Sequence, residues 1–180
     1  MIDLAPFCYK SNDRPYLLQP WTRGGFTWAT NGHILVRVPA HADVPDNKYA
    51  PNCERIIAYH DGATFAAFPA VKWPDPPDDE CSHCEGRGYK HNCPDCSCKC
   101  DECEGTGYAK LTGSVTVRGV LYNTKYIRMI QALLNAEFAQ KPAKEQPAPF
   151  RFDGGIGCVM PMRSEGKHHI GDIEKLASSG

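Results

Sequence analysis

The chain has 180 residues, of which 42% are hydrophobic and 23% are charged, and this is the balance of a soluble globular protein. Its length allows one ordinary domain with a small independent insert. The longest apolar runs are too short to cross a bilayer, and the first residues lack the basic start of a signal peptide. We therefore expect a cytoplasmic protein that has no contact with a membrane.

Charge is distributed unevenly along the chain. Residues 75–106 contain nine acidic and three basic side chains, whereas the remainder contains twelve acidic and seventeen basic ones, for a net charge of −1. An acidic segment repels phosphate groups, whereas zinc fingers that bind nucleic acid are basic. Residues 75–106 are therefore expected to bind protein, if they bind a partner at all.

Residues 1–74 are expected to form the first half of a domain made mostly of short strands. Runs of aromatic and β-branched residues indicate the strands, and Thr30-Asn31-Gly32 indicates a hairpin between two of them. Residues 53–59 favour one or two turns of helix. The expected strands are residues 16–20, 26–29, 33–38 and 64–70.

Seven of the ten cysteines lie between residues 81 and 103, inside an expected insert that spans residues 75–110. In a reducing cytoplasm such a cluster favours metal ligation over disulfides. Two C-x2-C pairs separated by fifteen residues fit the spacing of a tetrahedral zinc site. The predicted ligands of this outer zinc are Cys81, Cys84, Cys100 and Cys103.

Three further cysteines lie between the two outer pairs. They are Cys93, Cys96 and Cys98, and a histidine would complete a second set of zinc ligands. His91 is the expected fourth ligand of this inner zinc, and His83 is the alternative. The sequence thus predicts at least one zinc ion and favours two.

Each outer pair begins the same pattern, CxxCxGxG, at residues 81–88 and 100–107. This pattern resembles the cysteine-rich domain of DnaJ-type co-chaperones, in which the first unit pairs with the last around zinc. Four thiolates complete the coordination of the ion, whereas a catalytic zinc keeps one position open. The insert is therefore predicted to be a segment stabilised by metal. The resemblance also offers the alternative of a chaperone-type adaptor that grips other proteins.

After the insert, residues 111–163 are expected to complete the domain that residues 1–74 begin. Alternating valines indicate a strand, and Asn123 with Thr124 offers an N-cap to a helix of apolar residues at helical spacing. The expected elements are a strand at 114–122, a helix at 124–140, a loop at 141–149, strands at 149–152 and 157–162, and a flexible tail at 164–180 with a helical turn near 172–176.

Three stretches outside the insert are informative together because of the order in which they occur. Residues 29–35 read ATNGHIL, residues 115–134 are the expected strand and helix, and residues 159–163 read VMPMR. In the same order they resemble the ATDGHRL stretch, a strand–helix unit and the VMPMR stretch of bacterial DNA sliding clamps, the beta subunit of the replicative polymerase. The resemblance implies an α+β, sliding-clamp-like domain into which the zinc module is inserted.

The resemblance also implies two functional surfaces. Clamps encircle duplex DNA with the polar faces of their helices, and the matching DNA-facing candidates are Lys125, Arg128, Gln131 and Asn135. The alternative is an ordinary solvated helix face. Clamps also bind short linear peptides in an apolar pocket, and the matching candidates are Thr30, His33, Leu35, Val159 and Met162. The alternative for these apolar side chains is a place in the hydrophobic core.

No pattern typical of an enzyme accompanies these sites. Cys8, Cys53 and Cys158 have no evident base, and the glycine-rich turn at 154–157 lacks the lysine and the helix that phosphate binding requires. We expect a non-enzymatic zinc protein that contacts the replication machinery, as a phage or mobile-element homologue or mimic of the clamp. The alternatives are the chaperone-type adaptor and a zinc protein that binds duplex DNA. Assembly into a ring and a monomeric state both stay open.

Overall fold

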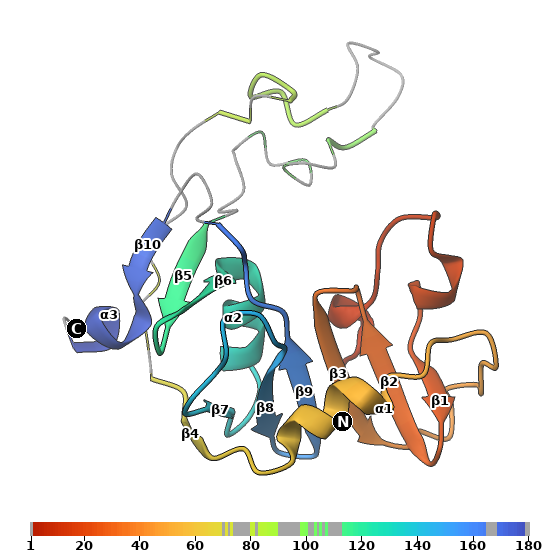
Figure 1. Ribbon diagram of the computed structural model, residues 1–180. Coiled ribbons are helices and arrows are strands. Elements are labelled where there is room, and N and C mark those ends of the chain that lie inside the picture. Colours follow the sequence, from red (N-terminus) through yellow and green to blue (C-terminus); the bar gives the residue numbers. More distant parts are fainter. Residues whose placement is uncertain are drawn as a thin grey trace.

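The computed structural model describes residues 2–69, 71, 73, 80, 81, 83–89, 98–100, 103, 105, 107, 113–164 and 169–178. These residues form a seven-stranded sheet, a three-stranded sheet and short helices, which confirms the α+β class (Figure 1). The large sheet contains, in spatial order, β1 Trp21–Arg23, β2 Phe26–Thr30, β3 Ile34–Pro39, β9 Gly155–Val159, β8 Ala148–Phe152, β7 Glu137–Ala139 and β4 Phe65–Ala67. The small sheet contains β10 His169–Asp172, β5 Ser114–Val117 and β6 Val120–Asn123.

Short helices connect the strands. They are the 3-10 turns Ala5–Phe7, Pro15–Leu17 and Ala58–His60 and the helices α1 Glu54–Ile57, α2 Thr124–Gln131 and α3 Ile173–Ser178. The predicted N-cap of α2 is confirmed, because the Asn123 side chain accepts a hydrogen bond from the Lys125 N–H at 2.9 Å. The first N–H of the same helix, on Thr124, donates to the carbonyl of Gly113 at 2.9 Å.

The two halves of the chain on either side of the insert meet in the centre of the large sheet. β3 pairs antiparallel with β9, and Ile34 lies opposite Val159. Position 157 requires glycine, because a Cβ at this position would collide with the Leu35 carbonyl oxygen at 2.4 Å. The described residues outside 80–107 therefore form one body. The described residues from 80 to 107, here called the cysteine module, lie beyond one end of it (Figure 1).

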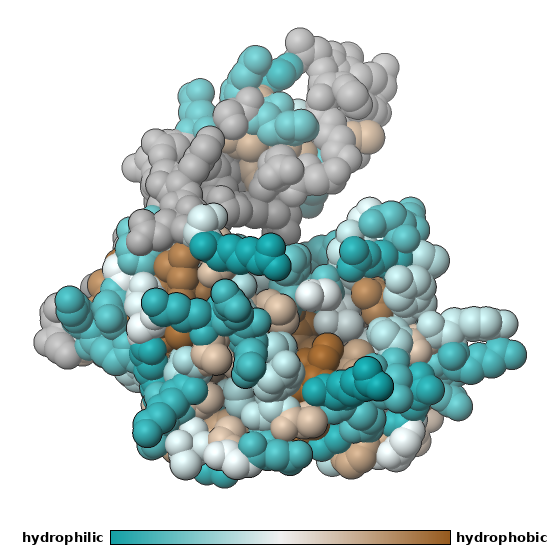
Figure 2. Space-filling model, in the orientation of Figure 1, coloured by the Kyte–Doolittle hydropathy of each residue, from teal (hydrophilic) through white to brown (hydrophobic). Residues whose placement is uncertain are grey.

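The large sheet separates two apolar clusters. Alternation along β3 places Ile34 and Val36 in the first cluster and Leu35 in the second. The first cluster lies against the small sheet and α2, and includes Val115, Tyr122, Ile127, Ile130, Phe138 and Phe150. The second includes Trp21, Trp28, Cys53 and Ile57. Because these large side chains are buried, the visible face of the body is mostly hydrophilic (Figure 2).

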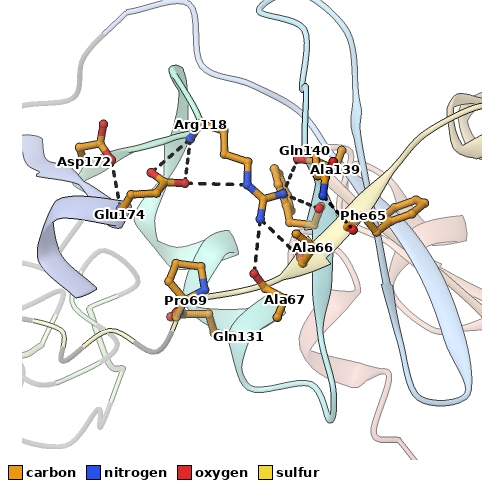
Figure 3. A network of polar contacts seen from close by, with 11 residues as sticks. Phe65, Ala66, Ala67, Pro69, Arg118, Gln131, Ala139, Gln140, Asp172 and Glu174 are labelled. Atoms are coloured by element: carbon orange, nitrogen blue, oxygen red, sulfur yellow. Dashed lines mark hydrogen bonds and ion pairs between the residues drawn. The ribbon is translucent and has the colours of Figure 1, made fainter. Parts of the chain in front are cut away.

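A single arginine connects the small sheet, the large sheet and the C-terminal helix. Arg118 lies in the turn between β5 and β6, and its guanidinium donates to four main-chain carbonyls, those of Phe138, Ala139, Ala66 and Ala67 (Figure 3). Its backbone N–H donates to the Glu174 carboxylate at 3.2 Å. Arg118 has a φ of 48°, which is uncommon for a residue with a side chain. These contacts offset the cost of that conformation.

The predicted hairpin of residues 26–38 and the predicted short helix at residues 53–59 are confirmed by β2–β3 and by α1 with its following 3-10 turn. The strand predicted at residues 16–20 is wrong, because Pro15 starts a 3-10 turn there. The strand predicted at 64–70 is shorter and corresponds to β4. The hairpin around residues 153–155 is confirmed by the pairing of β8 with β9.

Three larger differences follow the insert. The single strand predicted at 114–122 is a hairpin, because Arg118 and Gly119 both have positive φ and turn the chain. The helix predicted to reach residue 140 ends at Gln131, since Asn135 has a φ of 53° and Phe138 enters β7. The tail predicted to be flexible contains β10 and α3, which pack on β5 through the buried Ile173.

Candidate metal centre

Four cysteine thiols converge in the cysteine module. Cys81, Cys84, Cys100 and Cys103 are all buried, and their sulfur atoms lie within 4.8 Å of one another. The Sγ atoms of Cys81 and Cys100 are 3.9 Å apart, and those of Cys84 and Cys103 are 3.7 Å apart. The predicted outer ligands therefore form one cluster that could bind a metal ion, here called the four-cysteine group.

Each cysteine pair sits on a tight turn whose backbone points at the sulfur atoms. In the first turn the Gly86 N–H donates to the Cys81 carbonyl, and in the second the Gly105 N–H donates to the Cys100 carbonyl. The Gly88 N–H then donates to Cys84 Sγ at 3.2 Å, and the Gly107 N–H donates to Cys103 Sγ at 3.3 Å. Such bonds stabilise a thiolate, so the first turn supports a negative sulfur at Cys84 and the second at Cys103.

The glycines of the two turns also allow the turns to pack against each other. The Cys81 N–H donates to the Gly107 carbonyl and the Cys100 N–H donates to the Gly88 carbonyl, both at 2.8 Å. A Cβ on Gly88 would come within 2.5 Å of the Gly105 oxygen, and a Cβ on Gly107 within 2.2 Å of the Gly86 oxygen. The repeated CxxCxGxG pattern therefore encodes two turns that are related by an approximate two-fold axis. The glycines of each turn leave the space that the backbone of the other turn occupies.

The thiols differ in how readily they lose their protons. Burial raises the pKa of Cys84 to about 11. Burial also acts to raise the pKa of Cys103, but hydrogen bonds from the N–H groups of Gly107 and Gly105 and from the thiols of Cys84 and Cys100 together outweigh it and lower that pKa to about 6. Four adjacent thiolates repel one another strongly unless a cation lies between them. The donor set therefore fits a divalent metal ion that takes sulfur ligands in a closed tetrahedron.

The predicted inner site lies mostly outside the described residues. Cys93, Cys96 and His91 are not described. Cys98 and His83 are described, and both are exposed and do not belong to the four-cysteine group. Within the part of the chain that the structure describes, the four-cysteine group is the one cluster that could hold a metal ion.

The four predicted DNA-facing residues do not form one helix face. Lys125 and Arg128 are exposed on α2. The Gln131 side-chain amide instead makes two hydrogen bonds inside the protein. Its Nε2 donates to the Pro69 carbonyl, and its Oε1 accepts from the Trp73 indole at 2.7 Å. Asn135 lies beyond the end of α2, and its Nδ2 donates to an Asp153 carboxylate oxygen at 2.8 Å.

The five predicted pocket residues are also divided. Leu35 is buried in the second apolar cluster and Val159 in the first, so they lie on opposite faces of the sheet. The Thr30 hydroxyl donates to the Ile34 carbonyl inside the β2–β3 turn. His33 is exposed, and its carbonyl accepts from the Met160 N–H at 2.8 Å. The ATNGHIL and VMPMR stretches are thus neighbours, although Leu35 and Val159 do not face a common pocket.

Met162 instead lines a different cavity, which sequence reasoning missed. This cavity of about 750 Å³, here called the methionine groove, lies between residues 160–163, the β5–β6 hairpin, and Lys144 with Glu145. Met160 is 38% exposed at its edge, and the Met162 N–H donates to the Leu121 carbonyl on β6. The groove could not be foreseen because its wall is the hairpin that the sequence predicted as one strand.

Comparison with protein-family models, with curated proteins and with solved structures finds no match for this chain. Among the helices of the described residues, none has the length and apolar character needed to span a bilayer. The site must therefore be interpreted from its own geometry.

Proposed function

We propose that this chain is a non-enzymatic zinc protein of the cytoplasm, with a sliding-clamp-like body, that acts through protein contacts in DNA replication or its control. The four-cysteine group carries the first part of this proposal. Its four buried sulfur atoms could fill the four coordination positions of a structural zinc ion, and N–H groups support two of these sulfur atoms. Such an ion stabilises a segment that is too small for a hydrophobic core.

Metal analysis of the protein purified under reducing conditions tests this step. We expect about one zinc ion per chain from the four-cysteine group, because one ion satisfies four thiolates. A second zinc ion would identify the inner site at Cys93, Cys96, Cys98 and a histidine. Iron in place of zinc, or no metal at all, would contradict the proposal.

Features of the body support the proposal of a protein partner from the replication machinery. Two of the three stretches that resemble the sliding clamp, ATNGHIL and VMPMR, lie side by side through the pairing of β3 with β9 and the hydrogen bond from the Met160 N–H to the His33 carbonyl. Beside them, the methionine groove offers flexible thioethers with a polar rim, and this chemistry suits a short linear peptide. We place the contact with a replication protein in this groove.

A pull-down from the native host, probed for the replicative clamp, the clamp loader and the polymerase, tests the partner. Met160→Glu should abolish capture because it puts a charge at the edge of the groove. Tyr49→Glu, at a position that is 77% exposed and outside the groove, is the matched control. Equal capture by both variants would exclude the groove, and a strict monomer in light scattering would exclude a ring.

One observation favours a second function, in which the cysteine module itself grips protein as a chaperone-type adaptor. Tyr89 follows the first CxxCxGxG unit and is 49% exposed, and exposed aromatic rings contribute strongly to protein contacts. Tyr89→Ala should then abolish partner capture while Met160→Glu leaves it intact. The opposite result supports the groove.

A further inference from the structure

One exposed ring, two partly buried rings and three exposed cations lie around the β2–β3 turn and α2. In the middle, the imidazole of His33 stacks on the Tyr126 ring, with centroids 5.8 Å apart and an interplanar angle of 20°. The turn is held by Asn31, whose side-chain oxygen accepts from the N–H groups of His33 and Ile34. The exposed imidazole is therefore presented on a fixed support.

Cations flank this stacked pair on both sides. On one side, Arg14 lies over the Tyr9 ring. Its guanidinium also lies beside Gly32, the neighbour of His33, because Nη1 is 3.3 Å from the position that a Cβ on Gly32 would take. On the other side, Lys125 and Arg128 are exposed on α2, which contains no acidic residue. Asp13 is an acidic neighbour among the residues that the structure describes, and it accepts a hydrogen bond from the Tyr9 hydroxyl at 3.1 Å.

The cation furthest along α2 is also supported by a fixed ring. The Arg128 guanidinium lies 5.7 Å from the centroid of the Trp73 indole, which donates to Gln131. Gln131, predicted to face DNA, therefore acts beneath the surface by holding an aromatic ring in place. The result is a strip of three cations and three rings formed by Tyr9, Arg14, His33, Tyr126, Lys125 and Arg128, here called the ring–cation strip.

We propose that the ring–cation strip binds single-stranded nucleic acid. Unpaired bases stack on exposed aromatic rings, and cations between the rings neutralise the phosphates that connect the bases. A duplex keeps its bases stacked inside, so it would contact the cations and leave the rings unused. The strip therefore favours a single strand over the duplex that the sequence suggested. This site does not include the methionine groove and is independent of the proposed protein partner.

Fluorescence anisotropy of the full-length, metal-loaded protein with a labelled oligothymidylate, and with a duplex of the same length, tests the proposal. His33→Ala should weaken binding of the single strand by about 5- to 150-fold, from the usual contribution of one stacked base. Tyr126→Phe keeps the ring and should bind like the wild type, whereas Tyr126→Leu should bind as weakly as His33→Ala. Thermal unfolding and metal content of each variant confirm that the fold is retained.

Charge-reversal variants distinguish binding at the ring–cation strip from nonspecific attraction between nucleic acid and other basic residues of the body. Lys125→Glu and Arg128→Glu should each weaken binding and reduce the dependence of affinity on salt, by roughly 0.7 in the log–log slope per lost contact. Arg55→Glu, at an exposed position of α1, makes the same change in charge outside the strip. The proposal is overturned by no binding at low salt, by equal losses in the Arg55 control, or by a duplex that binds as tightly as the single strand.

Discussion

The cysteine module and the body are held together in different ways. In the module the one cluster of buried side chains consists of the four cysteines, and the turns around them meet through backbone atoms. In the body two clusters bury whole aromatic and branched side chains, among them Trp28, Tyr122, Phe138 and Phe150. Ordering a chain has an entropic cost everywhere, and here apolar burial offsets it in the body while a metal ion offsets it in the module. The two regions should therefore fail independently.

The largest expected effect is removal of one metal ligand. Cys100→Ser should abolish metal binding and unfold the module, because a structural zinc contributes roughly 10–16 kcal/mol in binding free energy. The thermal unfolding of the body should stay unchanged. Metal content, and hydrogen exchange compared between the module and β5–β9, measure the two effects. Cys98→Ser, at an exposed position outside the four-cysteine group, should keep the metal ion of that group. A large loss of body stability in Cys100→Ser would show that the regions are coupled.

The second prediction concerns the opposite region, where a buried side chain of the body is truncated and the cysteine module is left unchanged. Phe138 is fully buried and packs edge-on against Tyr122 and Phe68. Phe138→Ala should lower the free energy of unfolding by about 3–5 kcal/mol in urea titrations and leave the metal content unchanged. Leu134→Ala, at a position that is 70% exposed, should change stability by less than about 0.5 kcal/mol. Loss of metal from Phe138→Ala would contradict independent regions.

A matched pair of glycine substitutions sharpens the difference in packing. Gly107 in the module and Gly154 in the body have similar positive φ values, 79° and 84°. A Cβ on Gly154 would meet nothing within 4 Å, so Gly154→Ala should cost the body only about 1 kcal/mol of backbone strain. Gly107→Ala adds a collision with the Gly86 oxygen, and we expect a fall in metal affinity of more than about tenfold. Equal and small effects would refute the close backbone packing of the module.

The smallest expected effect concerns pH and the C-terminal segment. Burial raises the pKa of Glu174 above its usual value of 4.5, with Asp172 adding to the shift. The folded state therefore holds this proton more tightly, and the stability that results is present below pH 4.5 and is lost as the pH rises through the folded-state pKa. Glu174→Gln should flatten this part of the dependence of unfolding temperature on pH. Glu145→Gln, in an exposed loop, is the control, and parallel curves for Glu174→Gln and wild type would exclude the effect.

The features that sequence predicted well are local. The spacing of Cys81, Cys84, Cys100 and Cys103 is enough to define the four-cysteine group, because each turn is built within one CxxCxGxG unit. The hairpin at Asn31 and Gly32 and the cap at Asn123 also depend on neighbouring residues alone.

The features that sequence missed depend on distant contacts. Arginine is uncommon at positive φ, and the turn at Arg118 becomes favourable only through carbonyls of β4 and β7 and the carboxylate of Glu174. Phe138 continues the apolar spacing of α2, yet pairing with β4 and β8 draws it into a strand. The resemblance implied a pocket that Leu35 and Val159 share, but alternation along β3 places Leu35 in the second apolar cluster, on the face of the sheet opposite to Val159.

The reciprocal packing of the two cysteine turns has a consequence for the order of events during synthesis. The paired sulfur atoms are 19 residues apart in the chain, and the Cys81 N–H needs the carbonyl of Gly107, at the end of the second unit. While the protein is being made, the first pair of thiols therefore leaves the ribosome without its partner turn and without the glycine spaces into which it packs. Capture of the metal has to wait until the second unit has emerged, and the newly made chain passes through an interval in which Cys81 and Cys84 lack both a metal ion and a partner turn.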